Sequence, residues 1–163
     1  MNKSIQITWG TGKGATTLAA FDAALFDAGI ANHNLIHLSS IIPEGFSPSV
    51  EKPDLNYAGG FGDKMYVVMA EKRETRKGHQ AWAGLGWVIA EREQQKGLFV
   101  EHGGESEDEV ITLINKSLAS MVKYRKEAYG PVQYKTTGTA CEDEPVCAVV
   151  AAIFGTEGWK GFI

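Results

Sequence analysis

The sequence contains little that would bind a metal ion or cross a membrane. Its 163 residues include only two cysteines and four histidines, and two cysteines without neighbouring histidines make a poor zinc site. No apolar stretch approaches the roughly 20 residues of a membrane-spanning helix, and the amino terminus lacks the apolar core of a signal peptide. We therefore expect no metal, no membrane partner and a cytoplasmic protein.

Positive charge is also sparse. The chain has 16 Lys and Arg residues against 20 Asp and Glu residues, a formal net charge of -4, and it has no dense basic stripe that would suit nucleic acid or an anionic membrane. We expect no nucleic-acid partner, whereas a cationic small molecule fits this charge. With 44% apolar and 22% charged residues, the chain predicts a single domain over residues 1–163.

The two cysteines, Cys141 and Cys147, stand on either side of an acidic turn at residues 142–145. We expect both side chains to pack in the core. A disulfide across the turn is the alternative, which a reducing compartment disfavours.

Glycine is abundant, with 19 residues, and several of them fall between Gly10 and Thr17. A Walker A motif requires Ser or Thr after Gly-Lys, but Lys13 is followed by Gly14, so the segment does not fit a nucleotide site. It predicts instead a glycine-rich turn that delivers Thr16 or Thr17 as the amino-terminal cap of a helix.

Apolar periodicity and turn signals divide the chain into two helices and seven strands. We expect helices at residues 18–28 and 106–128, and strands at residues 5–9, 34–40, 64–73, 81–90, 98–101, 132–141 and 146–154. Residues 44–63 predict a long loop, and the last two strands are expected to pair across the acidic turn. Helices over a largely antiparallel sheet make this an α+β layered domain.

The adjacent serines Ser39 and Ser40 bear most directly on chemistry. A serine hydroxyl held against the preceding carbonyl can attack it, which converts the amide to an ester that breaks by β-elimination. A cut between Ser39 and Ser40 would leave dehydroalanine at the new amino terminus, and hydrolysis would turn this into a pyruvoyl group. Serine pairs that end a strand before a proline, here Pro43, are common, so the pair alone does not predict self-processing.

Five short motifs around this pair occur in a fixed order. They are FDAAL at residues 21–25, AGI at 28–30, NHNLI at 32–36, LSSIIP at 38–43 and GLFVE at 97–101. In this order and at these separations they resemble the pyruvoyl-dependent arginine decarboxylases. The resemblance covers most of the first 105 residues, and the small apolar residues at 148–152 are compatible with it.

The resemblance implies a role for five residues. Ser40 matches the residue that becomes the pyruvoyl cofactor, and Ser39 matches the carboxyl end of a β chain of residues 1–39, where it borders the substrate. Residues 40–163 would form the α chain. Asn34 matches the asparagine that promotes self-cleavage, for which hydrogen bonding to an oxyanion is a physical reason. Asp22 matches the acid that binds a guanidinium, and Glu101 matches the proton donor.

The implied activity is the decarboxylation of L-arginine to agmatine and CO2, a step toward polyamine biosynthesis. A Schiff base between the substrate and the pyruvoyl ketone would act as the electron sink, and Glu101 would protonate the carbanion. A carboxylate such as Asp22 suits the planar fork of a guanidinium. The implied fold is a four-layer αββα sandwich with largely antiparallel sheets. It would assemble as a homotrimer of αβ protomers, with a hexamer as the second option and active sites between neighbouring protomers.

Two alternatives remain open at this stage. The same fold and chemistry can serve another amino acid such as histidine, and an unprocessed chain can act as a non-catalytic binding or assembly subunit. Each residue also has an ordinary explanation. Asp22 can be a solvated surface acid, Glu101 can end a strand, and Asn34 can begin one.

Overall fold

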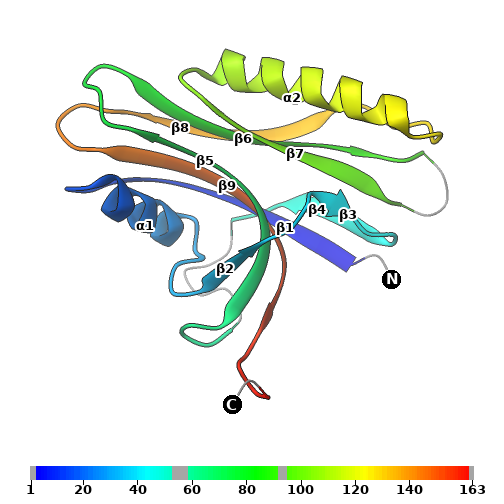
Figure 1. Ribbon diagram of the computed structural model, residues 1–163, viewed down its shortest axis with the longest axis horizontal. Helices are drawn as coiled ribbons and strands as arrows, with labels where there is room; N and C mark the ends of the chain where they lie inside the picture. The colour runs from blue at the N-terminus through cyan, green and yellow to red at the C-terminus, as the bar shows by residue number, and fades with distance from the viewer. Residues whose placement is uncertain (1–2, 53–58, 92–94, 162–163) are drawn as a thin grey trace.

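The computed structural model describes residues 3–52, 59–91 and 95–161, and these form four layers (Figure 1). Helix α2 (Glu107–Met121) covers a four-stranded sheet, which packs on a five-stranded sheet, and helix α1 (Thr17–Asp27) covers the far side of the second sheet. The expected α+β, four-layer αββα sandwich is therefore confirmed.

The four-stranded sheet is antiparallel and has the strand order β3-β7-β6-β8. Its strands are β3 (Ile41–Ile42), β7 (Gly97–Gly104), β6 (Gln80–Ile89) and β8 (Gln133–Ala140). The five-stranded sheet has the order β2-β5-β9-β1-β4, with antiparallel pairs at its centre and parallel pairs at both edges. Its strands are β2 (Asn34–His37), β5 (Lys64–Glu74), β9 (Val146–Glu157), β1 (Lys3–Lys13) and β4 (Phe46–Val50).

Strand β9 shows how the sequence builds the core. Its even-numbered residues from Val146 to Ala152 face the other sheet, and its odd-numbered residues from Cys147 to Ile153 face helix α1. Successive side chains of a strand point to opposite faces, and a sheet covered on both sides needs apolar residues on both. The unbroken apolar run of β9 therefore marks it as a central strand.

Helix α1 packs very close to strand β1. Its amino terminus is capped by the Thr16 hydroxyl, which accepts a hydrogen bond from the Ala19 N–H at 3.1 Å. A Cβ atom at Gly10 or Gly12 would overlap the backbone of Ala24. These glycines thus belong to a strand that the helix crosses, and the expected turn at this place is wrong because β1 continues to Lys13.

Several other boundaries differ from the expectations, and strand β9, for example, runs to Glu157 instead of residue 154. The strand predicted at 34–40 ends at His37, and β7 extends beyond the predicted 98–101 to Gly104. Helix α2 ends at Met121 and is followed by a 3-10 turn, Val122–Tyr124, rather than running to residue 128. The expected loop at 44–63 contains strand β4, which pairs in parallel with β1, and residues 53–58 of it lie outside the described residues.

The last two predicted strands exist, but they do not pair with each other. Strand β8 pairs with β6 and strand β9 pairs with β1 and β5, so the acidic turn carries the chain from one sheet to the other. Cys141 lies between the two sheets, whereas Cys147 lies on the α1 side of the five-stranded sheet. Both are buried free thiols, which rules out the disulfide alternative, and burial raises the pKa of the Cys147 thiol to about 12.

None of the helices in the described part of the chain is long and apolar enough to span a bilayer.

Candidate active site

The Ser39–Ser40 peptide bond lies where the chain passes from one sheet to the other. On its amino-terminal side, the Leu38 N–H donates to the carbonyl of Val67 in the five-stranded sheet, at 2.8 Å. On its other side, the Phe99 N–H of the four-stranded sheet donates to the Ser40 carbonyl, also at 2.8 Å. The candidate scissile bond is therefore held from both ends by different sheets.

Ser40 adopts a backbone conformation that is unusual for its residue type. Its φ angle is 65°, in the left-handed region that favours glycine. For a residue with a Cβ atom, this conformation costs roughly 1–2 kcal/mol. Ser40 is also buried, with 8% of its surface exposed. Such local strain is typical of functional sites because the surrounding structure must impose it.

The Ser40 side chain is directed at Glu101. Its Oγ atom lies 2.9 Å and 2.8 Å from the two carboxylate oxygens of Glu101, so its single proton is shared between them. Glu101 lies on β7 two positions after Phe99, which places both side chains on the inner face of the four-stranded sheet. In the isolated chain Glu101 is exposed. The structure thus brings together two of the predicted catalytic residues, which are 61 positions apart in sequence.

Asn34 lies at the opposite end of strand β2. Its Nδ2 atom donates to the Gly62 carbonyl at 2.7 Å, and the Trp159 indole N–H donates to the same carbonyl at 2.7 Å. The four residues of β2 span about 10 Å, since a strand rises about 3.3 Å per residue. The structure therefore does not bring Asn34 to Ser40 within one chain.

Asp22 is also away from the serine pair. It lies in the middle of α1 and is exposed, and no described residue forms a hydrogen bond or ion pair with it. Helix α1 packs on β1, β9 and β5, whereas Ser40 leads into β3 of the other sheet. Ser39 is exposed beside Ser40, so it is the one predicted substrate contact at the site in a single chain.

His102 is a neighbour of the site that the sequence did not mark as functional. It follows Glu101 on β7 and therefore points to the opposite face, where its Nε2 atom lies 2.8 Å from the Ser117 Oγ atom on α2. Partial burial lowers the pKa of His102, and the nearby charge of Glu101 opposes this shift. The strand alternation around Glu101 was the signal that placed this histidine against a helix.

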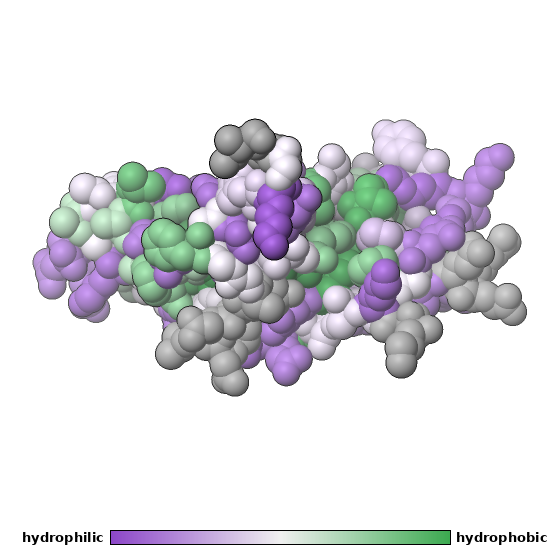
Figure 2. Space-filling view, turned by 90° about the horizontal axis from the view of Figure 1, so that it is seen from below, coloured by the Kyte–Doolittle hydropathy of each residue, from purple (hydrophilic) through white to green (hydrophobic). Residues whose placement is uncertain are grey.

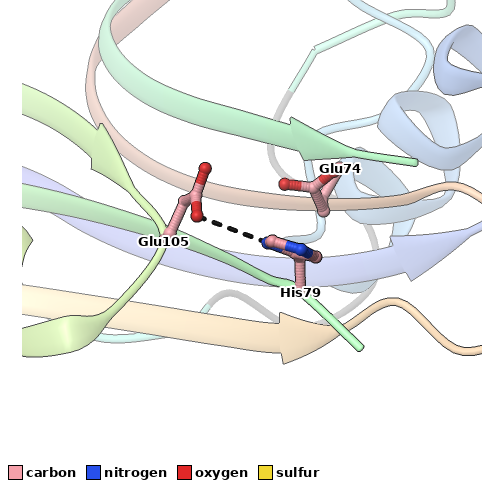
Figure 3. Close-up of side chains that lie close together, drawn as sticks. All are labelled: Glu74, His79 and Glu105. Carbon is pink, nitrogen blue, oxygen red and sulfur yellow. Dashed lines mark hydrogen bonds and ion pairs between the residues drawn. The ribbon is translucent and has the colours of Figure 1, made fainter. Parts of the chain in front are cut away.

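A second polar cluster involves Glu74, His79 and Glu105, which lie close together in Figure 3. Their ligand-type atoms are within 4.8 Å of one another, and this is the sole group of metal-ligand type among the described residues. However, the Arg76 guanidinium donates to both oxygens of Glu74, at 3.0 Å and 2.6 Å, and also to Glu105. These hydrogen bonds hold the pKa of Glu74 at about 2.

Arg76 thus supplies the positive charge that this cluster needs. Glu74 ends strand β5 of the five-stranded sheet, and Glu105 follows strand β7 of the four-stranded sheet. The cluster is therefore an ionic link between the two sheets. It lies just beyond the segment of β7 that carries Glu101.

Comparison with known proteins assigns the chain to a family. The family described as pyruvoyl-dependent arginine decarboxylase (PvlArgDC) matches residues 4–158. A protein of Halobacterium salinarum named pyruvoyl-dependent arginine decarboxylase is 38% identical over 155 residues, which covers 93% of each chain. One of the same name from Methanopyrus kandleri is 33% identical over 157 residues, 93% of this chain and 95% of the relative. The chain belongs to the pyruvoyl-dependent arginine decarboxylase family.

Proposed function

We propose that this protein cuts itself between Ser39 and Ser40 and then decarboxylates L-arginine to agmatine and CO2. The observation that carries the proposal is Ser40 itself. Ser40 is buried, has a strained backbone conformation and contacts the Glu101 carboxylate through its hydroxyl group. The Ser39–Ser40 peptide bond is flanked by hydrogen bonds to both sheets. The names of the relatives add the substrate, because those from Halobacterium salinarum and Methanopyrus kandleri are arginine decarboxylases by name.

The proposed cleavage consists of an acyl shift followed by an elimination. The Ser40 oxygen attacks the Ser39 carbonyl carbon, the peptide C–N bond breaks, and an ester forms with a free amine on residue 40. Loss of the Ser40 α-proton then breaks the ester C–O bond, which releases Ser39 as a carboxylate and leaves dehydroalanine. Water hydrolyses this group to a pyruvoyl group and ammonia. The strain at Ser40 favours the first step, because the cut removes the constraint that imposes it.

The residues present fit the pyruvoyl group. Glu101 already lies against the side chain that would be converted, and the Phe99 N–H holds the Ser40 carbonyl, which the group would retain. When formed, this cofactor supplies a ketone that withdraws electrons from the substrate carbon as CO2 leaves. Glu101 would then deliver the proton that this carbon needs.

Completion of the site requires a second protomer. Asn34 and Asp22 do not reach Ser40 in one chain, so we infer that neighbouring protomers of a homotrimer supply them, with a hexamer as a further level of assembly. Large apolar side chains are exposed near the serine pair, among them Leu38 at 36% and Ile41 at 51%. Figure 2 shows that apolar side chains are exposed on the face of the molecule seen from below in Figure 1. A protomer packed on this surface would also exclude water from the site.

Arginine is the substrate that the charges favour. A carboxylate at Asp22 binds a guanidinium in a bidentate manner, whereas histidine offers no such fork. The two buried free thiols also suit a reducing compartment, so we propose a cytoplasmic location.

The test is to purify the wild-type protein and to measure both its self-cleavage and its release of CO2 from arginine. Electrophoresis and intact mass should show fragments 1–39 and 40–163, and CO2 should be released from arginine in preference to lysine, histidine, ornithine and aspartate. The Ser40→Ala variant should stay intact and inactive, and Ser120→Ala, an exposed serine of α2, should behave as wild type. A wild-type chain that stays whole while it releases CO2, or one that prefers aspartate, would contradict the proposal.

A further inference from the structure

Two polar contacts join the end of strand β7 to helix α2, and one of them comes from His102, since the other is the Glu105 N–H, which donates to the Glu109 carboxylate at 2.7 Å. His102 points to helix α2, and its Nε2 atom lies 2.8 Å from the Ser117 Oγ atom. Ser117 lies one turn after Ile114, whose side chain is fully buried against the same sheet. The contact therefore joins the strand to the well-packed face of the helix.

The inner side of the same segment is fixed by close packing. A Cβ atom at Gly103 would lie 2.6 Å from the Glu71 carbonyl oxygen, so β7 runs directly against strand β5 at this point. Two residues later, Glu105 pairs with Arg76. Positions 102, 103 and 105 are thus each anchored, whereas the described contacts of the Glu101 side chain consist of its two short distances to Ser40.

We propose that His102 is a positioning residue for Glu101, and that its hydrogen bond to Ser117 sets where the Glu101 carboxylate lies relative to Ser40. The inference rests on the proposed function. His102 and Glu101 are consecutive on one strand, so a rotation or shift at His102 moves the Glu101 side chain directly. A misplacement of about 1 Å can cost on the order of 100-fold in rate, so one hydrogen bond outside the site can control chemistry inside it.

His102 is suited to this role because it is an uncharged anchor. Burial lowers its pKa below the ordinary value of 6.5, although Glu101 acts in the opposite direction. A neutral imidazole can exchange a hydrogen bond with a hydroxyl without placing a positive charge beside the Glu101 carboxyl group. No charged residue of α2 has a resolved effect on His102, so its described electrostatic neighbour is Glu101.

The test removes the contact from the helix side, where the fold is least at risk. Ser117→Ala deletes the hydroxyl and introduces a better helix former, and Ser117→Thr restores a hydroxyl at the same place. Ser120→Ala makes the same change on the exposed surface of α2 and is the matched control. For each variant we would measure the rate of self-cleavage by electrophoresis, then kcat and KM for arginine, and the melting temperature.

We expect Ser117→Ala to slow self-cleavage and lower kcat by about fivefold to tenfold, because the displacement of Glu101 should be smaller than the 1 Å that costs on the order of 100-fold. KM should stay close to that of Ser120→Ala, the melting temperature should fall by only a few degrees, and Ser117→Thr should recover most of the rate. Equal cleavage and kcat in Ser117→Ala and Ser120→Ala would overturn the inference, as would a change in KM alone. A wild-type chain that does not cleave would instead overturn the proposed function.

Discussion

The two parts of the candidate site are built in different ways. Ser40 and Glu101 meet inside one chain, because β3 pairs with the start of β7 and sets the two side chains at hydrogen-bonding distance. Asn34 and Asp22 lie on β2 and α1, and neither reaches Ser40. The difference teaches that the fold of one protomer holds the candidate scissile bond, whereas the proposed assembly would supply the groups that recognise the substrate or assist the cut.

The largest effect should come from Glu101→Gln, which tests the Ser40–Glu101 part of the site, the part that forms within one chain. An amide oxygen still accepts the Ser40 hydroxyl proton, so the chain should be cut, but an amide cannot donate the proton that the substrate carbon needs. We expect kcat to fall by roughly 100-fold to 10,000-fold while both fragments appear on a denaturing gel. Full turnover in this variant would remove Glu101 from the mechanism.

Asn34→Ala tests the other part of the site, for which we propose that an adjacent protomer supplies Asn34 and Asp22. Loss of an oxyanion donor should slow self-cleavage by roughly 100-fold to 1,000-fold. If Asn34 acts on the adjacent protomer, co-expression with a Ser40→Ala chain should restore part of the cleavage, because that chain still carries Asn34. Co-expression with the double variant Asn34→Ala/Ser40→Ala is the matched control and should restore none. Equal cleavage with both partners would show that Asn34 does not act in trans.

Gly12→Ala should lower the stability of the fold and weaken arginine binding without stopping self-cleavage, which would distinguish the two parts of the site. The added Cβ atom would overlap the backbone of Ala24 and push α1 away from β1, at a cost of about 1–3 kcal/mol in unfolding free energy. Because α1 carries Asp22, KM for arginine should rise while self-cleavage continues. Gly130→Ala is the control, since its Cβ atom would meet nothing closer than 3.5 Å. Thermal melts and initial rates are the measurements, and an unchanged melting temperature would contradict the packing argument.

The smallest effect concerns the ionic link between Glu74, Arg76 and Glu105, which lies beyond the segment of β7 that carries Glu101. Hydrogen bonds from Arg76 hold the pKa of Glu74 at about 2, below its usual 4.5. The stability from this carboxylate is therefore present above the unfolded pKa near 4.5 and is lost as the pH falls toward 2. We expect Glu74→Gln to melt below wild type at pH 7, with the gap closing on acidification. The exposed Glu142→Gln should show no such trend.

The sequence predicted the layers better than it predicted the connections. Capping residues and apolar periodicity located both helices, and the apolar run of β9 located a central strand. The pairing of β8 with β9 was wrong because a short turn can cross between sheets as easily as it can close a hairpin, and local sequence does not distinguish the two. Strand β4 was missed because Pro48 and its polar neighbours suppress the alternating pattern, while its position at a sheet edge tolerates a proline.

Family motifs were sufficient to predict which residues belong to the candidate site. They did not predict the geometry of the site, because tertiary contacts determine it. Nothing in the sequence shows that Ser40 has a positive φ angle or that its hydroxyl meets Glu101, since both depend on the packing of β3 against β7. The Arg76 cluster escaped notice for the same reason, as its members come from β5, from the turn after it and from the end of β7. Tertiary pairing, not residue type, creates these features.

The central position of β1 determines what becomes of the protein after the cut. This strand pairs with β9 on one side and β4 on the other, so a fragment of residues 1–39 would stay inside the sheet and remain bound to the fragment of residues 40–163. Denaturation of the nicked protein would then separate two molecules, and its midpoint would rise with protein concentration. Renaturation would become a second-order encounter, so the proposed cut would replace a unimolecular folding reaction with one in which two fragments must find each other.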